Sequence, residues 1–137
     1  MNRVLDASVY VAVLRQDEIH HTAAKALYEA HPTAQPYLVP PVFRLEVLAA
    51  LARRGEGAQV LDAVDALVRG PRFLPADLDR ALLEKAVALA RLARLRAYDA
   101  LYGALAIAHD AELVTLDEEL AIRLRAAVPT ARIVLAG

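Results

Sequence analysis

Apolar and polar positions follow two different patterns along the chain. Short apolar runs bounded by turn-forming residues indicate strands, whereas longer segments with apolar residues three and four positions apart indicate helices. We expect strands at residues 3–5, 37–39, 72–74, 112–115 and 132–135. We expect helices at about residues 9–14, 22–30, 42–54, 58–68, 78–94, 97–110 and 118–126. One or two helices therefore separate each strand from the next.

This alternation predicts how the elements are arranged in space. Successive parallel strands need long crossover connections, and helices provide them, so the sheet should be mostly parallel with helices on both faces. We predict a three-layer α/β/α fold with a short sheet of four to five strands, in a single domain over residues 1–137. The closing strand, 132–135, is expected at an edge of the sheet. The pattern leaves the order of the strands open.

Composition narrows the classes of function. The chain contains no cysteine, which excludes disulfides, thiolate zinc sites and a cysteine nucleophile. Its net charge is -1 and its pI about 6.4, so any contact with nucleic acid must come from a local basic patch. No apolar segment approaches the roughly 18 residues of a membrane span, and Asp6 interrupts the first apolar run. We expect no membrane association and a cytoplasmic location.

Two aspartates stand directly after predicted strands. Asp6 follows strand 3–5 and Asp117 follows strand 112–115. Open α/β sheets bind ligands beyond the carboxyl ends of their strands, at the point where the strand order reverses. If these two strands are neighbours at that point, both carboxylates converge in one crevice.

Asp99 and Glu46 lie on predicted helices beside apolar residues. Asp99 falls in the first turn of helix 97–110, on a mostly apolar face where Gly103 is expected to leave room above the carboxylate. The neighbours of Glu46 at helical spacing, which include Phe43 and Ala50, are apolar. Burying an unpaired ionised carboxylate is costly, so Glu46 should find a cation, a hydrogen-bonding partner or a metal.

Each aspartate also has a purely structural interpretation. Asp6 could form an Asx-type turn, Asp99 could favour a helix N-terminus, and Asp117 could cap the helix that follows it.

Three further residues adjoin these acids. Ser8 is placed to cap helix 9–14, and both Ser8 and Thr115 are expected to be capping or turn residues. Alternatively, Ser8 and Thr115 could orient the neighbouring carboxylates. Arg96 is interpreted as a surface residue that could pair with Asp99 or contact phosphate.

Taken together, these residues resemble a known family. The resemblance to the PIN-domain nucleases, and in size to the VapC-type toxins of bacterial type II toxin–antitoxin pairs, covers essentially the whole chain. It is carried by Val4-Leu-Asp6-Ala-Ser8, Glu46, Tyr98-Asp99-Ala100 and Leu113-Val-Thr-Leu-Asp117. It implies a PIN fold whose first strand is central. It also implies a catalytic quartet that binds Mg²⁺ or Mn²⁺, and the matching residues are Asp6, Glu46, Asp99 and Asp117.

The resemblance implies that such a quartet hydrolyses RNA. Hard divalent cations prefer oxygen ligands, and they activate water and neutralise phosphodiester charge. The resemblance implies an endoribonuclease that leaves 5′-phosphate and 3′-hydroxyl ends. Its expected partners are an RNA substrate, a cognate antitoxin and a second copy of the chain in a homodimer.

Alternative functions remain open from the sequence. The chain could be a housekeeping PIN nuclease of RNA processing, or a non-catalytic binding or dimerisation module that uses its apolar helices. A phosphatase of the haloacid-dehalogenase type would use Asp6 as a nucleophile and would need a second aspartate two residues later. This chain has Ser8 at that position.

Overall fold

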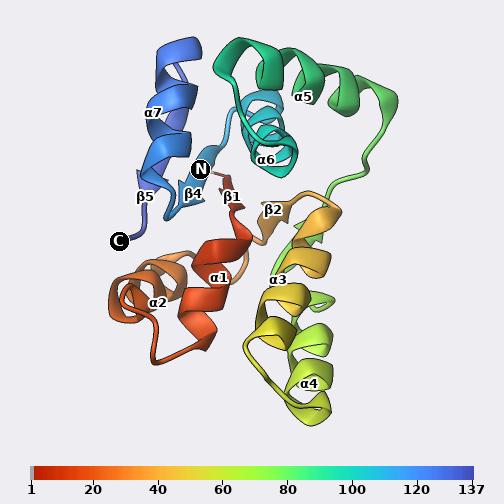
Figure 1. Cartoon of the computed structure of the whole chain (residues 1–137), viewed down its shortest axis with the longest axis vertical. Helices are drawn as coiled ribbons and strands as arrows, with labels where there is room; N and C mark the ends of the chain where they lie inside the picture. The colour runs from red at the N-terminus through yellow and green to blue at the C-terminus, as the bar shows by residue number, and fades with distance from the viewer. Residues whose placement is uncertain (1) are drawn as a thin grey trace.

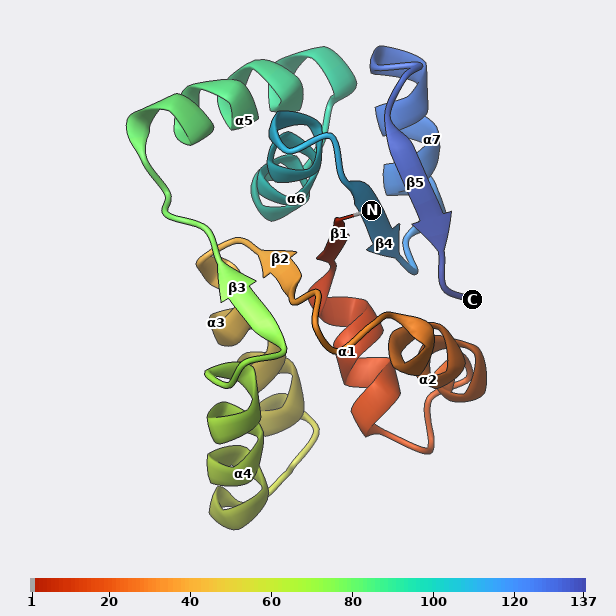
Figure 2. The ribbon, with the colours of Figure 1, turned by 180° about the vertical axis from the view of Figure 1, so that it is seen from behind.

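In the computed structural model, which describes residues 2–137, one sheet of five parallel strands is formed. The strand order is β3-β2-β1-β4-β5, as can be followed in Figure 2. The strands are β1 (Arg3–Leu5), β2 (Tyr37–Val39), β3 (Phe73–Pro75), β4 (Glu112–Thr115) and β5 (Arg132–Leu135). The first strand is central and β5 is an edge strand, so both of these predictions are confirmed.

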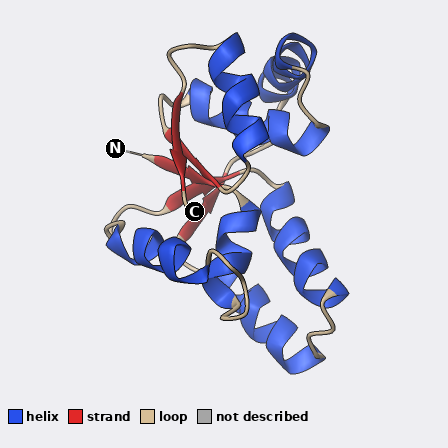
Figure 3. Cartoon of the chain, turned by 60° about the vertical axis from the view of Figure 1, so that its left-hand side comes forward, coloured by secondary structure: helices blue, strands red, loops and turns tan. Residues whose placement is uncertain are grey.

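Helices cover both faces of this sheet. The helices are α1 (Ala7–Leu14), α2 (His21–Ala30), α3 (Val42–Arg53), α4 (Ala58–Val68), α5 (Arg80–Ala93), α6 (Ala97–Ala108) and α7 (Glu118–Ala127). Figures 1 and 3 show α1 to α4 on one side of the strands and α5 to α7 on the other. The predicted three-layer α/β/α fold is therefore confirmed. Within residues 2–137, no helix combines the length and the apolar character that a membrane crossing requires.

The sheet has its switch point between β1 and β4. These strands pair in parallel, with Leu5 opposite Val114, and the Asp6 N–H donates to the Val114 carbonyl at 2.9 Å. After β1 the chain turns into α1 on one face of the sheet, whereas after β4 it turns into α7 on the other. The residues that follow these two strands thus stand side by side at the crevice that such a reversal opens.

The first helix begins two residues earlier than predicted. Its N-cap is Asp6 rather than Ser8, because the Asp6 carboxylate accepts a hydrogen bond from the Ser8 N–H at 3.4 Å. The capping role predicted for Ser8 is therefore wrong. An aspartate carboxylate satisfies one of the free N–H groups of the first turn in the same way that a serine hydroxyl would.

Gly103 is a contact point between helices. A Cβ atom at this position would lie 2.9 Å from Leu89 Cδ2 and 3.6 Å from the Leu124 methyl groups. The expectation that Gly103 leaves room above Asp99 is therefore wrong. The missing side chain instead lets α6 pack closely against leucines of α5 and α7, which fixes the helix that carries Asp99.

An aromatic cluster fixes the helix that carries Glu46. The rings of Tyr10, Phe43 and Phe73 pack together, with centroids 4.9 Å apart for Tyr10 and Phe73 and 5.1 Å for Phe43 and Phe73. Phe43 is fully buried. Since Glu46 lies one helical turn beyond Phe43, this packing also fixes the position of its backbone.

We expect Phe43→Ala to destabilise the protein by about 3–5 kcal/mol, because it removes a buried ring and leaves a cavity. The matched control is Leu45→Ala on the same helix, where the side chain is 60% exposed and the expected change is within about 0.5 kcal/mol. Urea denaturation measures both. Equal losses in the two variants would contradict this account of the core.

Candidate functional site

Asp6 is a buried carboxylate at the C-terminal end of β1. Only 7% of the residue is exposed, and its Oδ2 accepts a hydrogen bond from the Thr115 hydroxyl at 2.7 Å. Burial raises the pKa of Asp6, while the donors from Thr115 and Ser8 act in the opposite direction. Both oxygens of the carboxylate are therefore held in place by neighbouring groups.

Thr115 connects Asp6 to Asp117. Its hydroxyl, fully buried on β4, donates to Asp6 and accepts a hydrogen bond from the Asp117 N–H at 3.1 Å. Asp117 in turn caps α7 by accepting from the Leu120 N–H through Oδ1 at 3.0 Å. The turn and capping roles considered for Asp6 and Asp117 are thus both present in the structure. Among the described residues, Oδ2 of Asp117 has no hydrogen-bonding partner.

Glu46 is half-buried on α3 and has one hydrogen-bonding partner. The Tyr102 hydroxyl, on the buried side of α6, donates to Glu46 Oε1 at 2.8 Å. Burial raises the pKa of Glu46 to about 7, the bond from Tyr102 lowers it in part, and the charges of Asp6 and Asp99 raise it further. The bond joins the two helical layers at the rim of the sheet.

Tyr102 is a site residue that the sequence did not predict. The sequence did contain a signal, because Tyr102 lies one helical turn after Asp99 and carries the one hydroxyl among its neighbours on that mostly apolar face.

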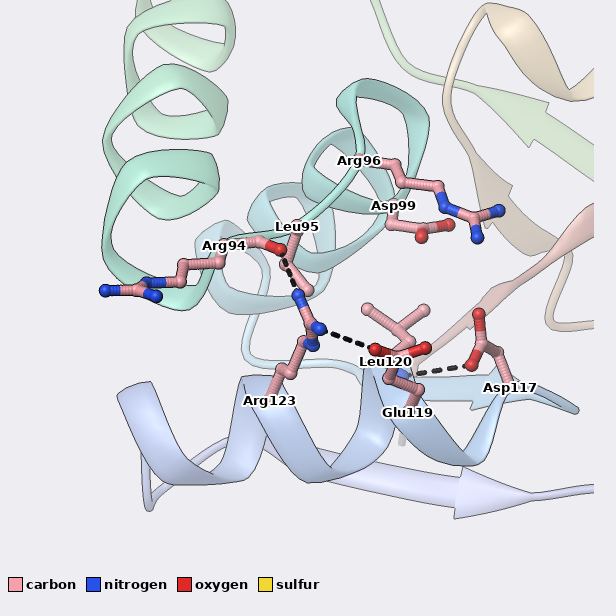
Figure 4. Close-up of a pocket in the computed structure, with 8 residues that line it drawn as sticks. All are labelled: Arg94, Leu95, Arg96, Asp99, Asp117, Glu119, Leu120 and Arg123. Carbon is pink, nitrogen blue, oxygen red and sulfur yellow. Dashed lines mark hydrogen bonds and ion pairs between the residues drawn. The ribbon is translucent and has the colours of Figure 1, made fainter.

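Asp99 is half-buried in the first turn of α6 and forms no hydrogen bond or ion pair with the described residues. Burial raises its pKa to about 6, and the charges of Asp6 and Asp117 act in the same direction. Arg96 lowers the pKa slightly, but its guanidinium forms no ion pair with Asp99. In Figure 4 the carboxylates of Asp99 and Asp117 point into the same hollow, of about 170 Å³, with Arg96 beside Asp99.

All four acids predicted from the sequence line one cleft of about 720 Å³. Ser8, which is exposed, also lines it. The acids come from four different places in the fold: Asp6 after β1, Glu46 on α3, Asp99 on α6 and Asp117 after β4. The cleft also contains groups that the sequence did not single out as site residues, notably Tyr98 and Arg53.

The cleft brings the acids together without forming a closed set of ligands. Within residues 2–137, no three Asp, Glu or His side chains lie close enough to hold one ion between them. Magnesium usually keeps several waters and takes only one or two carboxylates directly. The oxygen donors of this cleft therefore suit a largely hydrated Mg²⁺ or Mn²⁺ rather than a caged ion.

The family of the chain follows from its sequence. Residues 3–124 match the PIN domain, so the chain belongs to the PIN-domain family and has the PIN fold. No curated protein matches the chain in sequence.

Solved structures share this fold. The Mycobacterium tuberculosis toxin VapC20, described as cleaving the sarcin–ricin loop, superposes with a TM-score of 0.75 at 18% identity, over 88% of this chain and 94% of that one. A toxin–antitoxin complex from Klebsiella pneumoniae gives 0.70 at 19% identity, over 100% and 98% of the two chains. The Rickettsia felis VapBC2 complex, bound to a DNA fragment of its promoter, gives 0.68 at 16% identity, over 98% of each chain. At these identities the likeness is one of fold.

We expect Thr115→Val to destabilise the protein by about 1–3 kcal/mol, because a buried carboxylate loses its hydroxyl donor while the volume of the side chain is kept. The control is Thr130→Val, at an exposed position near the start of β5. Thermal or urea denaturation of both variants checks this. A Thr115→Val protein as stable as the control would show that the bond to Asp6 contributes nothing to folding.

Proposed function

We propose that this protein is a metal-dependent endoribonuclease that hydrolyses RNA phosphodiester bonds, and that it is the toxin of a toxin–antitoxin pair. The observation that carries the proposal is the convergence of Asp6, Glu46, Asp99 and Asp117 in one cleft at the switch point of the sheet. Membership of the PIN-domain family supports the same chemistry. The products would carry 5′-phosphate and 3′-hydroxyl ends.

The four carboxylates are the proposed metal-binding and catalytic residues. A divalent cation supplies a Lewis acid that neutralises phosphodiester charge and activates water. Asp6 is pre-positioned by Thr115 and by the Ser8 N–H, and Glu46 is pre-positioned by Tyr102. Asp99 has no such partner, so it is the carboxylate most free to adjust to an ion. Arg96, beside Asp99, would contact a phosphate of the substrate.

The electrostatics of the cleft favour binding of a cation. Glu46 and Asp99 have pKa values raised to about 7 and about 6, because they are buried and face other carboxylates. A cation removes the repulsion and lowers these pKa values, so its binding should release protons near neutral pH.

Features of the solved neighbours support the assignment as a toxin. The Klebsiella pneumoniae neighbour comes from a toxin–antitoxin complex, and VapC20 is itself described as a toxin. We therefore propose a cognate antitoxin as the protein partner, a homodimeric state and action in the cytoplasm. We also propose that residues 1–137 form one nuclease domain, since strands from both ends of the chain share one sheet. An aspartyl-phosphatase role is disfavoured because Ser8 stands where that mechanism needs a second aspartate.

We expect cleavage of RNA only when Mg²⁺ or Mn²⁺ is present, because the cleft holds oxygen ligands and its acids are not arranged as a metal-free acid–base pair. A panel of structured and unstructured RNAs, incubated with each cation and with excess EDTA, tests this. Cleavage that persists undiminished in EDTA would contradict the metal requirement, and no cleavage of any RNA with either cation would contradict the proposed function.

We expect Asp99→Asn to abolish cleavage while leaving the metal-free protein as stable as the unsubstituted protein, or more stable. The pKa of Asp99 is raised from 3.8 to about 6 in the folded state, so the folded protein binds the proton more tightly than the unfolded chain does. The stability that this gives is fully present below pH 4 and is lost as the pH rises through 6. At pH 8 the ionised carboxylate repels its neighbours, and asparagine removes that repulsion.

Thermal melts at pH 8, in EDTA and in millimolar Mn²⁺, measure this effect. Added Mn²⁺ should stabilise the unsubstituted protein more than the variant, because binding to the folded state adds to stability. Asp77→Asn, at an exposed position away from the cleft, is the control and should change neither quantity. If Asp99 serves only the helix N-terminus, its replacement should instead cost about 0.3–1 kcal/mol with or without metal.

A further inference from the structure

The second helix, α2, buries few of its side chains. It packs along α1, but only Ala24 of α2 is fully buried. At the first residue of the helix, the His21 ring bonds to the Ala12 carbonyl of α1 at 2.7 Å. A helix that buries so little apolar surface opens easily unless contacts at its ends hold it. The contacts at the C-terminal end of α2 therefore matter for how firmly the helix is held.

One arginine closes the C-terminal end of α2. Arg72, which lies just before β3, donates hydrogen bonds to the carbonyls of Tyr28, His31 and Pro32 at 3.1, 3.2 and 3.1 Å. The Tyr37 hydroxyl on β2 donates to the same Tyr28 carbonyl at 3.2 Å. Carbonyls in the last turn of a helix have no partner further along the helix, and these donors supply one. The end of α2 is thus tied to β2 and to the start of β3 by one cluster.

The His31 ring is buried in this cluster and lacks one hydrogen-bonding partner. Only 4% of the residue is exposed, and its ring centroid lies 4.4 Å from that of Tyr37. Among the described residues, none bonds to His31 Nε2. A neutral imidazole leaves one ring nitrogen without a proton, whereas an imidazolium has a proton on both nitrogens and a positive charge. A protonated His31 would therefore bury a charge together with an unpaired N–H, which is costly.

The charged groups that act on His31 are cations. The Arg72 guanidinium, which also lies over the rings of Tyr28 and Tyr37 at 4.9 and 5.1 Å, is one of them, and Arg3 is another. Arg3 is paired with Glu112 at 3.0 Å, but no carboxylate of the described chain pairs with His31 itself. The titratable groups around the ring are Tyr28 of α2, Tyr37 of β2, Arg3 of β1 and Arg72 before β3.

These surroundings favour the neutral ring. Burial lowers the pKa of His31 from its ordinary value of 6.5, the charges of Arg3 and Arg72 lower it further, and a hydrogen bond with the Gln35 backbone raises it in part. The folded protein thus binds this proton less tightly than an opened chain does. The stability that neutral His31 gives is fully present above pH 6.5 and is lost as the pH falls from 6.5 through the folded value.

We propose that His31 is an acid-sensitive latch for α2: its neutral ring holds the end of the helix in the cluster, and its protonation releases α2 and residues 32–36. Histidine is the side chain whose charge ordinarily changes between pH 5 and 8, so mild acid is enough to act on it. None of the residues of the cluster lines the acidic cleft. The latch is therefore independent of the proposed ribonuclease activity.

Hydrogen–deuterium exchange at pH 7.5, 6.5 and 5.5, corrected for the intrinsic exchange rates, measures the latch. Protection of the α2 amides should fall by up to tenfold for each pH unit below 6.5, because opening is coupled to the uptake of one proton. The amides of α5, in the other helical layer, are the internal reference and should not lose protection with them. An NMR titration of the His31 ring in the folded protein should show a midpoint below pH 6.5.

Two substitutions remove the proton-binding group in different ways. His31→Gln keeps a hydrogen-bonding side chain, and His31→Phe keeps a ring against Tyr37. Each should make the protection of α2 independent of pH in this range, whatever it does to the absolute protection, so one folded variant is enough. The matched control is His21→Gln, which removes the histidine at the start of α2 and should leave the acid response in place.

Four outcomes would overturn the proposal. They are α2 protection that does not change between pH 7.5 and 5.5, an acid response that persists in the His31 variants, an equal loss of protection in α5, and a His31 midpoint at or above pH 6.5. All are measured on the protein alone, without RNA or metal, so they are distinguishable from a failure of the proposed ribonuclease function.

Discussion

The parallel pairing of β1 with β4 is the constraint on which the rest of the site depends. It places Asp6 and Asp117 after neighbouring strands whose chains leave toward opposite faces of the sheet. The Thr115 hydroxyl links the two residues, because it donates a hydrogen bond to the Asp6 carboxylate and accepts one from the Asp117 N–H. Because the helices that follow lie in different layers, a crevice opens there, and α3 and α6 each bring one further acid to it.

Stability and function make opposing demands on this cleft. A hydrophobic core requires buried carboxylates to be neutral or hydrogen-bonded, whereas cation binding requires them to be ionised and close together. The structure supplies hydroxyl and N–H donors to Asp6 and Glu46 and leaves Asp99 without one. The pKa values of Glu46 and Asp99 are raised first by burial and then by the charges of the neighbouring carboxylates. Under the proposed function, a divalent cation bound in the cleft would offset both effects.

Much of the fold could be predicted from the sequence because periodicity records which face of each element is buried. Apolar runs located the strands, and the position of Asp6 and Asp117 after two of them suggested their convergence. Contacts between elements that are distant in the sequence could not be predicted in this way, because they leave no periodic pattern along the chain. The bond from Tyr102 to Glu46 depends on how two helical layers meet, and the role of Gly103 depends on leucines of α5 and α7. The cap of α1 was misassigned because Asp6 and Ser8 both suit that position.

We have proposed that Asp6, Glu46, Asp99 and Asp117 form one divalent-cation site. Anomalous diffraction from crystals grown with millimolar Mn²⁺ tests it most directly, since manganese is located without reference to activity. We expect a manganese peak among the oxygens of these carboxylates, with the ion bound to one or two of them directly and to the others through water. A peak only elsewhere on the protein, or an empty cleft at a Mn²⁺ concentration that supports RNA cleavage, would contradict it.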